Sequence, residues 1–196
     1  MTTSEQPKVR AADRIRETAR ELFYTKGIRA VGVDEIVTRA GVTKPSLYRA
    51  YASKDDLAAD YVATWGDGFM RRFEATLSEF PYDPKAGVLA FFKRLGERAE
   101  AKGFRGCAVS NCVVEYPEKS HPGRAAALRH KTQVRARLGE LAREMGARKP
   151  DQLGDALFLL LEGCFLTGQA FGEDGPAKAA KKAASALIDA YTVPKD

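Results

Sequence analysis

The sequence has few histidines, and it lacks the residue arrangements that hydrolases and nucleotide-binding enzymes use. It contains two histidines, His121 and His130, and neither lies beside a plausible nucleophile. It has no phosphate-cradling glycine loop and no dinucleotide-binding glycine fingerprint. These absences argue against an enzyme. A helical-bundle enzyme or carrier is kept only as the alternative from a different functional class.

Cysteine is scarce, and no apolar run approaches the length of a membrane span. The three cysteines, Cys107, Cys112 and Cys164, form no Cys-x-x-Cys pair, and their odd number argues against a disulfide framework. The first residues, Met-Thr-Thr-Ser-Glu-Gln-Pro, are polar and unlike a secretion signal. We therefore expect reduced thiols and a cytoplasmic protein.

Basic residues exceed acidic ones, giving a net charge of +6 and a pI near 9.2. Residues 1–56 hold 11 Lys and Arg against 8 Asp and Glu, which is half of the excess in under a third of the chain. This balance favours an anionic partner near the N-terminal end without requiring one.

Almost every segment has helical periodicity, so we predict an all-α fold. Residues 1–8 are expected to form a disordered arm. A stripe from Leu57 to Phe73 recurs every fourth residue and predicts one long helix. The expected helices are 9–25, a short helix from 33, one from 43, one from 53, then 85–102, 107–115, 125–145, 151–171 and 176–191. Within 125–145, the residues interpreted as a solvated basic face are Arg129, Lys131, Arg135, Arg137 and Arg143.

The segment from Gly41 to Leu57, Gly-Val-Thr-Lys-Pro-Ser-Leu-Tyr-Arg-Ala-Tyr-Ala-Ser-Lys-Asp-Asp-Leu, has the pattern of a DNA-reading helix. Thr43 can cap its start, and Leu47 and Tyr51 share an inward face at i,i+4 spacing. A short helix from Val33 ends at a glycine, Gly41, where a left-handed turn is needed. A short helix, a glycine turn and a capped second helix make a helix-turn-helix.

The run from about Ile15 to Leu57 resembles the DNA-binding domain of the tetracycline-repressor (TetR) family of bacterial transcription regulators. The matching pieces follow in order and without gaps: Ala19-Arg-Glu-Leu-Phe23, Lys26-Gly27, Val33-Asp-Glu-Ile36, Ala40-Gly-Val-Thr-Lys44, Ser46-Leu-Tyr48, Tyr51 and Ser53-Lys-Asp-Asp-Leu57. The resemblance implies a three-helix DNA-binding domain at 9–69, with its helix-turn-helix at about 32–51. It also implies a double-stranded DNA operator as partner. From the residues themselves we expect no cofactor and no catalytic residues, and no bound metal, because Cys107, Cys112, Glu115 and His121 match no compact zinc pattern.

The resemblance further implies which side chains contact DNA. Lys44, Tyr48 and Lys54 stand at family positions that touch the DNA backbone. The positions that read or approach bases are Thr43, Pro45, Ser46 and Arg49. The remaining predicted contacts are Gly32 and Val33, at the start of the first helix of the motif. Two residues depart from the pattern: Gly32 replaces the usual Ser or Thr cap, and Ala50 replaces a residue that often touches phosphate.

Residues 70–196 are expected to bind an effector and to dimerise, as in the family. The aromatic residues as a set favour a small, mostly apolar ligand, although for any single one of them a place in the core is the favoured interpretation. The candidate pocket residues are Trp65, Phe69, Phe91, Phe92, Phe104, Cys107, Asn111, Glu115, Phe158, Glu162 and Phe165. Apolar and alanine-rich patterns at 151–191 predict that the last two helices form a four-helix bundle with a second copy.

Several of these residues have alternative interpretations. Asn111 and Glu115 are able either to point into a pocket or to hold a helix end. Glu162, alone in an apolar run, suits a cationic ligand or a helix edge. A redox- or metal-responsive regulator of the same fold, acting through Cys107, Cys112 or Cys164, remains open beside the ligand-responsive one.

Overall fold

The structure is a computed structural model that describes residues 10–192. Over this range every named element is a helix, and the β-type pairing is one isolated bridge between Ala147 and Thr192. The prediction of an all-α fold is confirmed. The arm expected at residues 1–8 lies outside the described residues.

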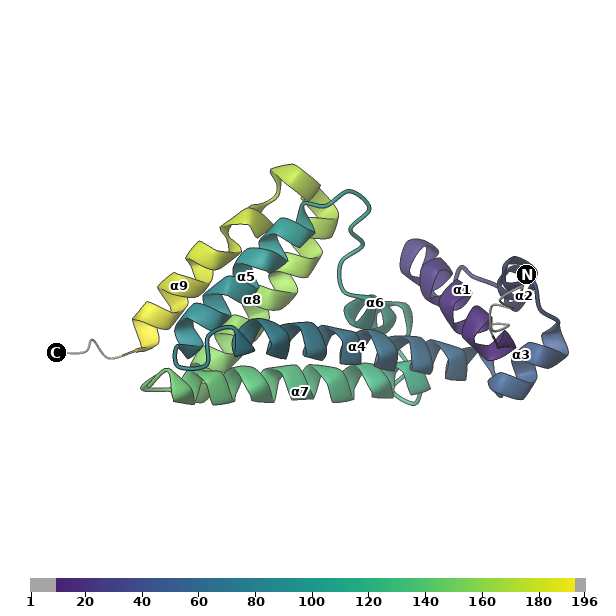
Figure 1. Cartoon of the computed structure of the whole chain (residues 1–196), viewed down its shortest axis with the longest axis horizontal. Coiled ribbons are helices and arrows are strands. Elements are labelled where there is room, and N and C mark those ends of the chain that lie inside the picture. Colours follow the sequence, from purple (N-terminus) through teal and green to yellow (C-terminus); the bar gives the residue numbers. More distant parts are fainter. Residues whose placement is uncertain (1–9, 193–196) are drawn as a thin grey trace, which may run out of the picture.

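Three short helices form one end of the molecule (Figure 1). They are α1 (Ala11–Lys26), α2 (Val33–Ala40) and α3 (Lys44–Ala50). Their shared core is apolar and closed to solvent, since Ile15, Leu22, Ile36 and Leu47 are all 0% exposed. This small core sets the angle at which α3 lies on the surface.

A long helix connects this end to the rest of the chain, running beside α7 along the molecule (Figure 1). The remaining elements are α4 (Lys54–Ser78), α5 (Pro84–Ala99), α6 (Ala108–Glu115), α7 (Pro122–Glu144), α8 (Pro150–Phe171), two 3₁₀ turns (Gly172–Asp174 and Pro176–Ala179) and α9 (Ala180–Tyr191). Helices α5, α8 and α9 pack together at the end opposite to α3, and α6 lies between the two ends. Helix α4 is thus the element shared by both ends.

Two helix starts differ from the sequence prediction. Helix α7 begins at Pro122 rather than at 125, because the Nδ1 atom of His121 accepts a hydrogen bond from the Gly123 N–H at 3.1 Å and caps the helix. The last segment begins with a 3₁₀ turn at Pro176 and becomes α-helical at Ala180.

The expectation that no apolar segment reaches the length of a membrane span is wrong for α8. The stretch Pro150–Asp174 is 25 residues long and contains an 18-residue window with a mean hydropathy of 1.2, enough to cross a membrane by length and composition alone; 39% of that window is buried. The core helix of a globular protein meets the same criterion. Here one face of α8, with Leu153, Leu157 and Leu161, is covered, while Leu159 and Leu166 on the other face are 70% and 69% exposed.

The basic face predicted on α7 is only partly solvated. Lys131 is 17% exposed and forms an ion pair with Glu162, and Arg137 is 24% exposed and contacts Glu74 at 2.9 Å. Both long side chains turn inward because acidic partners on α8 and α4 face them. Arg135 and Arg143 are exposed and pair with Asp155 and Asp151, both at 2.5 Å.

His130 lies inside an aromatic cluster formed by α4, α5 and α8. Its ring is 5.4 Å from that of Phe69 and 6.3 Å from that of Trp65, both edge-on. Gly66 permits this approach, because a Cβ atom there would lie 2.9 Å from the His130 ring. Burial lowers the pKa of His130 to about 4, with the nearby Lys131 charge adding to the effect.

This depressed pKa predicts a pH-dependent stability. An unfolded histidine titrates near 6.5, so between pH 6.5 and 4 the unfolded state binds the proton more readily, and the free energy of unfolding falls as the pH falls. We expect a loss of roughly 1–3 kcal/mol over this window, levelling off below pH 4. Urea unfolding of the wild type and of His130→Phe at several pH values measures it: on acidification the free energy of unfolding of the wild type should fall relative to that of the variant. Parallel curves would contradict the assignment.

Candidate nucleic-acid interface and effector pocket

Helix α3 is held at its start by its own side chains and from beneath by Leu47. The hydroxyl of Thr43 accepts a hydrogen bond from the Ser46 N–H at 3.4 Å, and Pro45 lies in the first turn, where no backbone donor is needed. Gly41, with a φ of 62°, makes the left-handed turn that brings α3 across α2. These features give the helix-turn-helix geometry that the sequence indicated.

The outer face of α3 carries the polar side chains predicted to contact DNA. Lys44, Pro45, Tyr48 and Arg49 are exposed, with Tyr48 at 51%, while Leu47 is fully buried beneath them. The Arg49 guanidinium donates to the Ser46 hydroxyl at 3.0 Å, so it already lies along the helix surface. The outer face of α3 therefore presents hydrogen-bond donors and an aromatic ring that lie about one helical turn apart.

Lys44 has an acidic partner that sequence reasoning missed. Its Nζ atom lies 2.7 Å from Asp34 Oδ1 on α2, and both side chains are exposed. This hydrogen bond raises the pKa of Lys44, so the ammonium is fully charged at neutral pH. A phosphate approaching Lys44 has to compete with Asp34, because one ammonium group faces both anions.

Three of the predicted DNA-contacting residues lie away from the outer face of α3. Gly32 is the exposed residue that begins α2, without a side-chain cap, and Val33 follows it half-buried. Lys54 begins α4 and is also half-buried; burial lowers its pKa, and the nearby carboxylates of Asp55 and Glu115 oppose that shift. The three positions flank α3 rather than form part of it.

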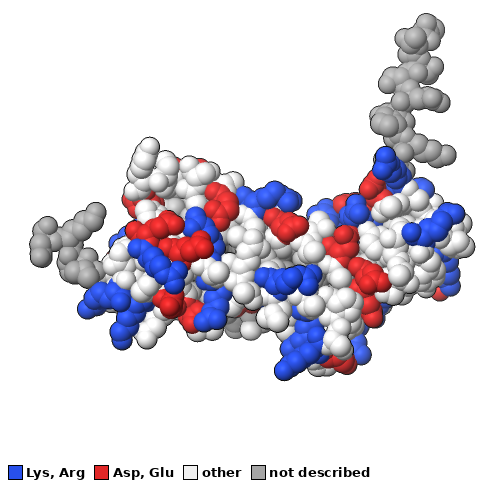
Figure 2. Space-filling view, turned by 90° about the horizontal axis from the view of Figure 1, so that it is seen from below, with Lys and Arg blue, Asp and Glu red and all other residues white. Residues whose placement is uncertain are grey.

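On the one face that Figure 2 shows, charge alone does not mark the α3 end. On the face shown in Figure 2, Lys and Arg are spread along the whole molecule with Asp and Glu among them. A general electrostatic attraction to DNA is therefore weaker evidence for an interface than the local geometry of α3.

The segment around α6 joins the two ends of the molecule by polar contacts. The Glu115 carboxylate accepts a hydrogen bond from the Arg29 N–H at 2.7 Å, and the Glu115 carbonyl accepts one from the Arg29 guanidinium at 3.0 Å. The Tyr24 hydroxyl accepts another from the Arg105 N–H at 2.9 Å. Glu115, predicted in the pocket, thus contacts the loop between α1 and α2 instead.

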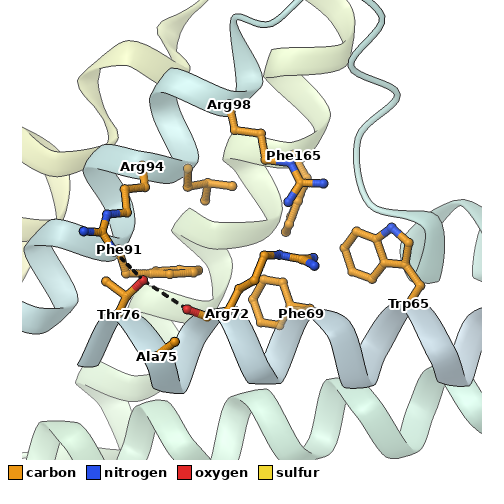
Figure 3. A pocket seen from close by; sticks show the side chains of 10 residues that line it. Trp65, Phe69, Arg72, Ala75, Thr76, Phe91, Arg94, Arg98 and Phe165 are labelled. Atoms are coloured by element: carbon orange, nitrogen blue, oxygen red, sulfur yellow. Dashed lines mark hydrogen bonds between the residues drawn. The ribbon is translucent and has the colours of Figure 1, made fainter. Parts of the chain in front are cut away.

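A cavity of about 320 Å³ lies between α4, α5 and α8. Four of its lining residues are among those predicted from the sequence: Trp65, Phe69, Phe91 and Phe165. The others are Arg72, Ala75, Thr76, Arg94, Leu95 and Arg98 (Figure 3). Its size is at the lower end of the range for small-molecule sites, and its floor is aromatic.

Beside this cavity, Trp65, Phe69 and Phe165 also line a narrow crevice that has no room even for a water molecule. It is lined in addition by the predicted residues Cys107, Phe158 and Glu162. The Glu162 carboxylate accepts hydrogen bonds from Lys131 and, at 2.7 Å, from the Ser110 hydroxyl, so its cationic partner is internal. Lys131 Nζ also lies 3.5 Å from Cys107 Sγ.

The remaining predicted pocket residues lie elsewhere. Phe92 is fully buried in the core, and Phe104 stacks on Phe165 with ring centroids 6.2 Å apart. The Asn111 amide donates to the Arg105 carbonyl at 2.9 Å and holds the loop before α6. This is the structural alternative that the sequence left open for Asn111.

The three arginines at the cavity were not among the pocket residues predicted from the sequence, which were aromatic residues with Cys107, Asn111, Glu115 and Glu162. A signal was present: Arg72 follows Phe69 by three residues, and Arg94 follows Phe91 by three. On a helix, residues three apart share a face, so Arg72 and Arg94 are expected beside a pocket aromatic; Arg98 has no such signal.

All three cysteines are free and buried. Burial raises the pKa of Cys112 and of Cys164 to about 11, which disfavours the reactive thiolate at neutral pH. Across residues 10–192, no three His, Cys, Asp or Glu residues gather in a way suited to a metal ion. The geometry therefore gives no support to a metal-responsive site in this part of the chain.

A surface helix capped by Thr43, packed across a second short helix through a glycine turn, defines a helix-turn-helix DNA-binding protein. Residues 15–61 match the family model described as bacterial regulatory proteins, tetR family. The transcriptional regulator AcuR of Cereibacter sphaeroides is 31% identical over 155 residues, which cover 74% of this chain and 70% of AcuR. The chain therefore belongs to the TetR family of transcriptional regulators.

Two other similarities agree with this assignment. The crystal structure of SCO4454, a TetR-family transcriptional regulator from Streptomyces coelicolor, is 28% identical with a TM-score of 0.88, covering 95% of this chain and 98% of that one. The transcriptional activator FasR of Mycolicibacterium smegmatis is 32% identical over 100 residues, covering 50% of this chain and 45% of FasR. These relatives are regulators, a class that is generally not enzymatic.

Proposed function

We propose that this protein is a dimeric repressor that leaves a palindromic operator when a small, mostly apolar ligand binds. The observation that carries the proposal is the placement of two sites on one helix. Helix α4 begins directly after the DNA-reading face of α3 and lines the aromatic cavity with Trp65 and Phe69. A ligand in the cavity is thereby in contact with the element that positions α3.

The proposed DNA contacts follow from exposure on and around α3. Lys44, Tyr48 and Lys54 bind phosphates, and Arg49 reads a guanine by two hydrogen bonds, worth about 1–3 kcal/mol of discrimination. The remaining proposed contacts, which fix position or approach the bases, are Gly32, Val33, Thr43, Pro45 and Ser46. One short helix gives few contacts, so two copies on a symmetric site are needed for useful specificity.

The proposed dimer forms through the last two helices, at about 151–191. On α8 a stripe of exposed small and apolar residues, Leu159, Gly163, Leu166 and Ala170, follows helical spacing. On α9 the exposed residues Ala186 and Ala190 permit close approach of another helix. A second copy would cover this apolar face, as in the bundles expected for the family.

The proposed division of labour places DNA binding at 9–69 and effector binding and dimerisation at 70–196, in a cytoplasmic protein. Helix α4 crosses this boundary without a break, since it runs from Lys54 to Ser78. Release from DNA requires that the ligand bind more tightly to the conformation whose two α3 helices no longer fit successive major grooves.

The proposal is tested by selecting bound duplexes from a random-sequence DNA pool and footprinting the protein on the selected site. We expect an inverted repeat protected over both halves, and two chains per duplex. Transcription from the native promoter that carries this site should rise when the protein is absent. A DNA footprint without two-fold symmetry would contradict the proposed dimer. A fall in transcription when the protein is absent would show that it is an activator.

A further inference from the structure

The mouth of the α4–α5–α8 cavity combines an aromatic floor with an excess of positive charge. Three of its lining residues are arginines, Arg72 on α4 and Arg94 and Arg98 on α5, and none is acidic. Figure 3 shows the guanidinium groups of Arg72 and Arg98 directed toward the same space beside Phe165. An apolar ligand alone would leave these charges without a role in binding.

Only one of the three arginines has an acidic partner among the described residues. Arg94 forms two hydrogen bonds of 2.7 Å with the Glu79 carboxylate and a third of 3.0 Å with the Thr76 hydroxyl. Neither Arg72 nor Arg98 has an ion pair or a side-chain hydrogen bond within residues 10–192. Two guanidinium groups, from two helices, are therefore free to bind at the mouth.

The electrostatics around Arg72 favour the binding of an anion. Burial lowers the pKa of Arg72, and the positive charges of Arg98 and Arg71 lower it further. A bound carboxylate would offset this repulsion and accept the paired N–H groups that guanidinium presents.

We propose that the effector is an amphiphilic organic anion, whose carboxylate or similar group binds between Arg72 and Arg98 while its apolar part lies against Trp65, Phe69, Phe91 and Phe165. This inference rests on the proposed function, because it names the chemical class of the ligand for the same cavity. The cavity of about 320 Å³ limits the apolar part to a single ring or a short chain.

The test compares ligands of one shape and different charge. Phenylbutyrate, its neutral amide and the corresponding amine are titrated against the DNA-free protein, with octanoate and octanamide as a second matched pair. Trp65 is the single tryptophan of the chain and lines the cavity, so its fluorescence reports occupancy, and calorimetry gives an independent affinity. We expect each carboxylate to bind about tenfold more tightly than its amide, the amine to bind most weakly, and the preference to shrink at high salt.

Arginine variants identify the groups responsible. Arg72→Gln combined with Arg98→Gln should abolish the preference for carboxylate over amide and leave amide affinity nearly unchanged. Arg71→Gln is the matched control, because Arg71 is an exposed arginine on the same helix that does not line the cavity, and it should retain the preference. Neither Arg72 nor Arg98 supports the fold by an ion pair, so thermal melting should stay close to that of the wild type.

Three results would overturn the anion site: equal affinity for carboxylate and amide, a preference that survives in the double variant, or no binding of either carboxylate at millimolar concentration. A mobility shift with phenylbutyrate separates this inference from the proposed function. If the carboxylates bind with the expected preference but DNA remains bound, the ligand site stands and ligand-controlled release is wrong.

Discussion

Replacing Lys44 and Tyr48 together by alanine is expected to lower operator affinity by about a hundredfold or more while leaving the fold intact. Each copy loses one charged and one aromatic hydrogen-bonding group from α3, and a dimer loses both twice. Mobility shift on the selected duplex measures the loss. The dependence of affinity on salt should also weaken, because fewer phosphates are neutralised.

The matched control is Lys93→Ala combined with Tyr82→Ala. Lys93 is 62% exposed on α5, and Tyr82 is 97% exposed before α5, so the same two residue types are removed far from α3. Operator affinity of this control should equal that of the wild type. Leu47 remains in both variants, so their thermal melting should be similar. Unchanged DNA binding by the α3 variant would show that α3 is not the reading helix.

Leu159→Glu combined with Leu166→Glu is expected to separate the proposed dimer and to reduce operator affinity by about a thousandfold. The two leucines are 70% and 69% exposed in the single chain, so the added carboxylates remain hydrated in a monomer but would be buried between two copies. Sedimentation measures the association state and mobility shift measures the affinity.

Val114→Glu is the control for this variant. Val114 is 82% exposed on α6, and its replacement adds one carboxylate, against two in the α8 variant, at an exposed apolar position outside α8 and α9. It should stay dimeric and bind DNA normally. If the α8 variant also remains dimeric, another surface holds the two copies together.

The local chemistry of α3 could be predicted from sequence because its determinants are neighbours in the chain. The hydroxyl of Thr43 caps a helix that begins one residue later, and Gly41 supplies the turn two residues before it. Such short-range geometry depends on backbone conformation and hydrogen bonds within one turn. The same applies to Ser53, whose hydroxyl accepts from the Asp56 N–H at 3.0 Å at the start of α4.

The partners of polar side chains could not be predicted, because they come from distant parts of the sequence. Glu115 binds the backbone of Arg29, 86 residues earlier, and Glu162 meets Lys131, 31 residues earlier. Periodicity shows which face a residue occupies but not what faces it. The aromatic floor of the cavity was foreseen in part. Arg72 was not, although its spacing of three residues from Phe69 places both on one face of α4.

The length of α4 gives small displacements at the cavity a large consequence. At about 1.5 Å of rise per residue, its 25 residues extend roughly 37 Å. Rotation of this rod by about 5° around its cavity end would sweep the opposite tip through roughly 3 Å. This displacement is comparable to the length of a hydrogen bond. A rearrangement of a few side chains around a bound molecule therefore suffices to misalign α3 with the DNA groove that it is proposed to enter.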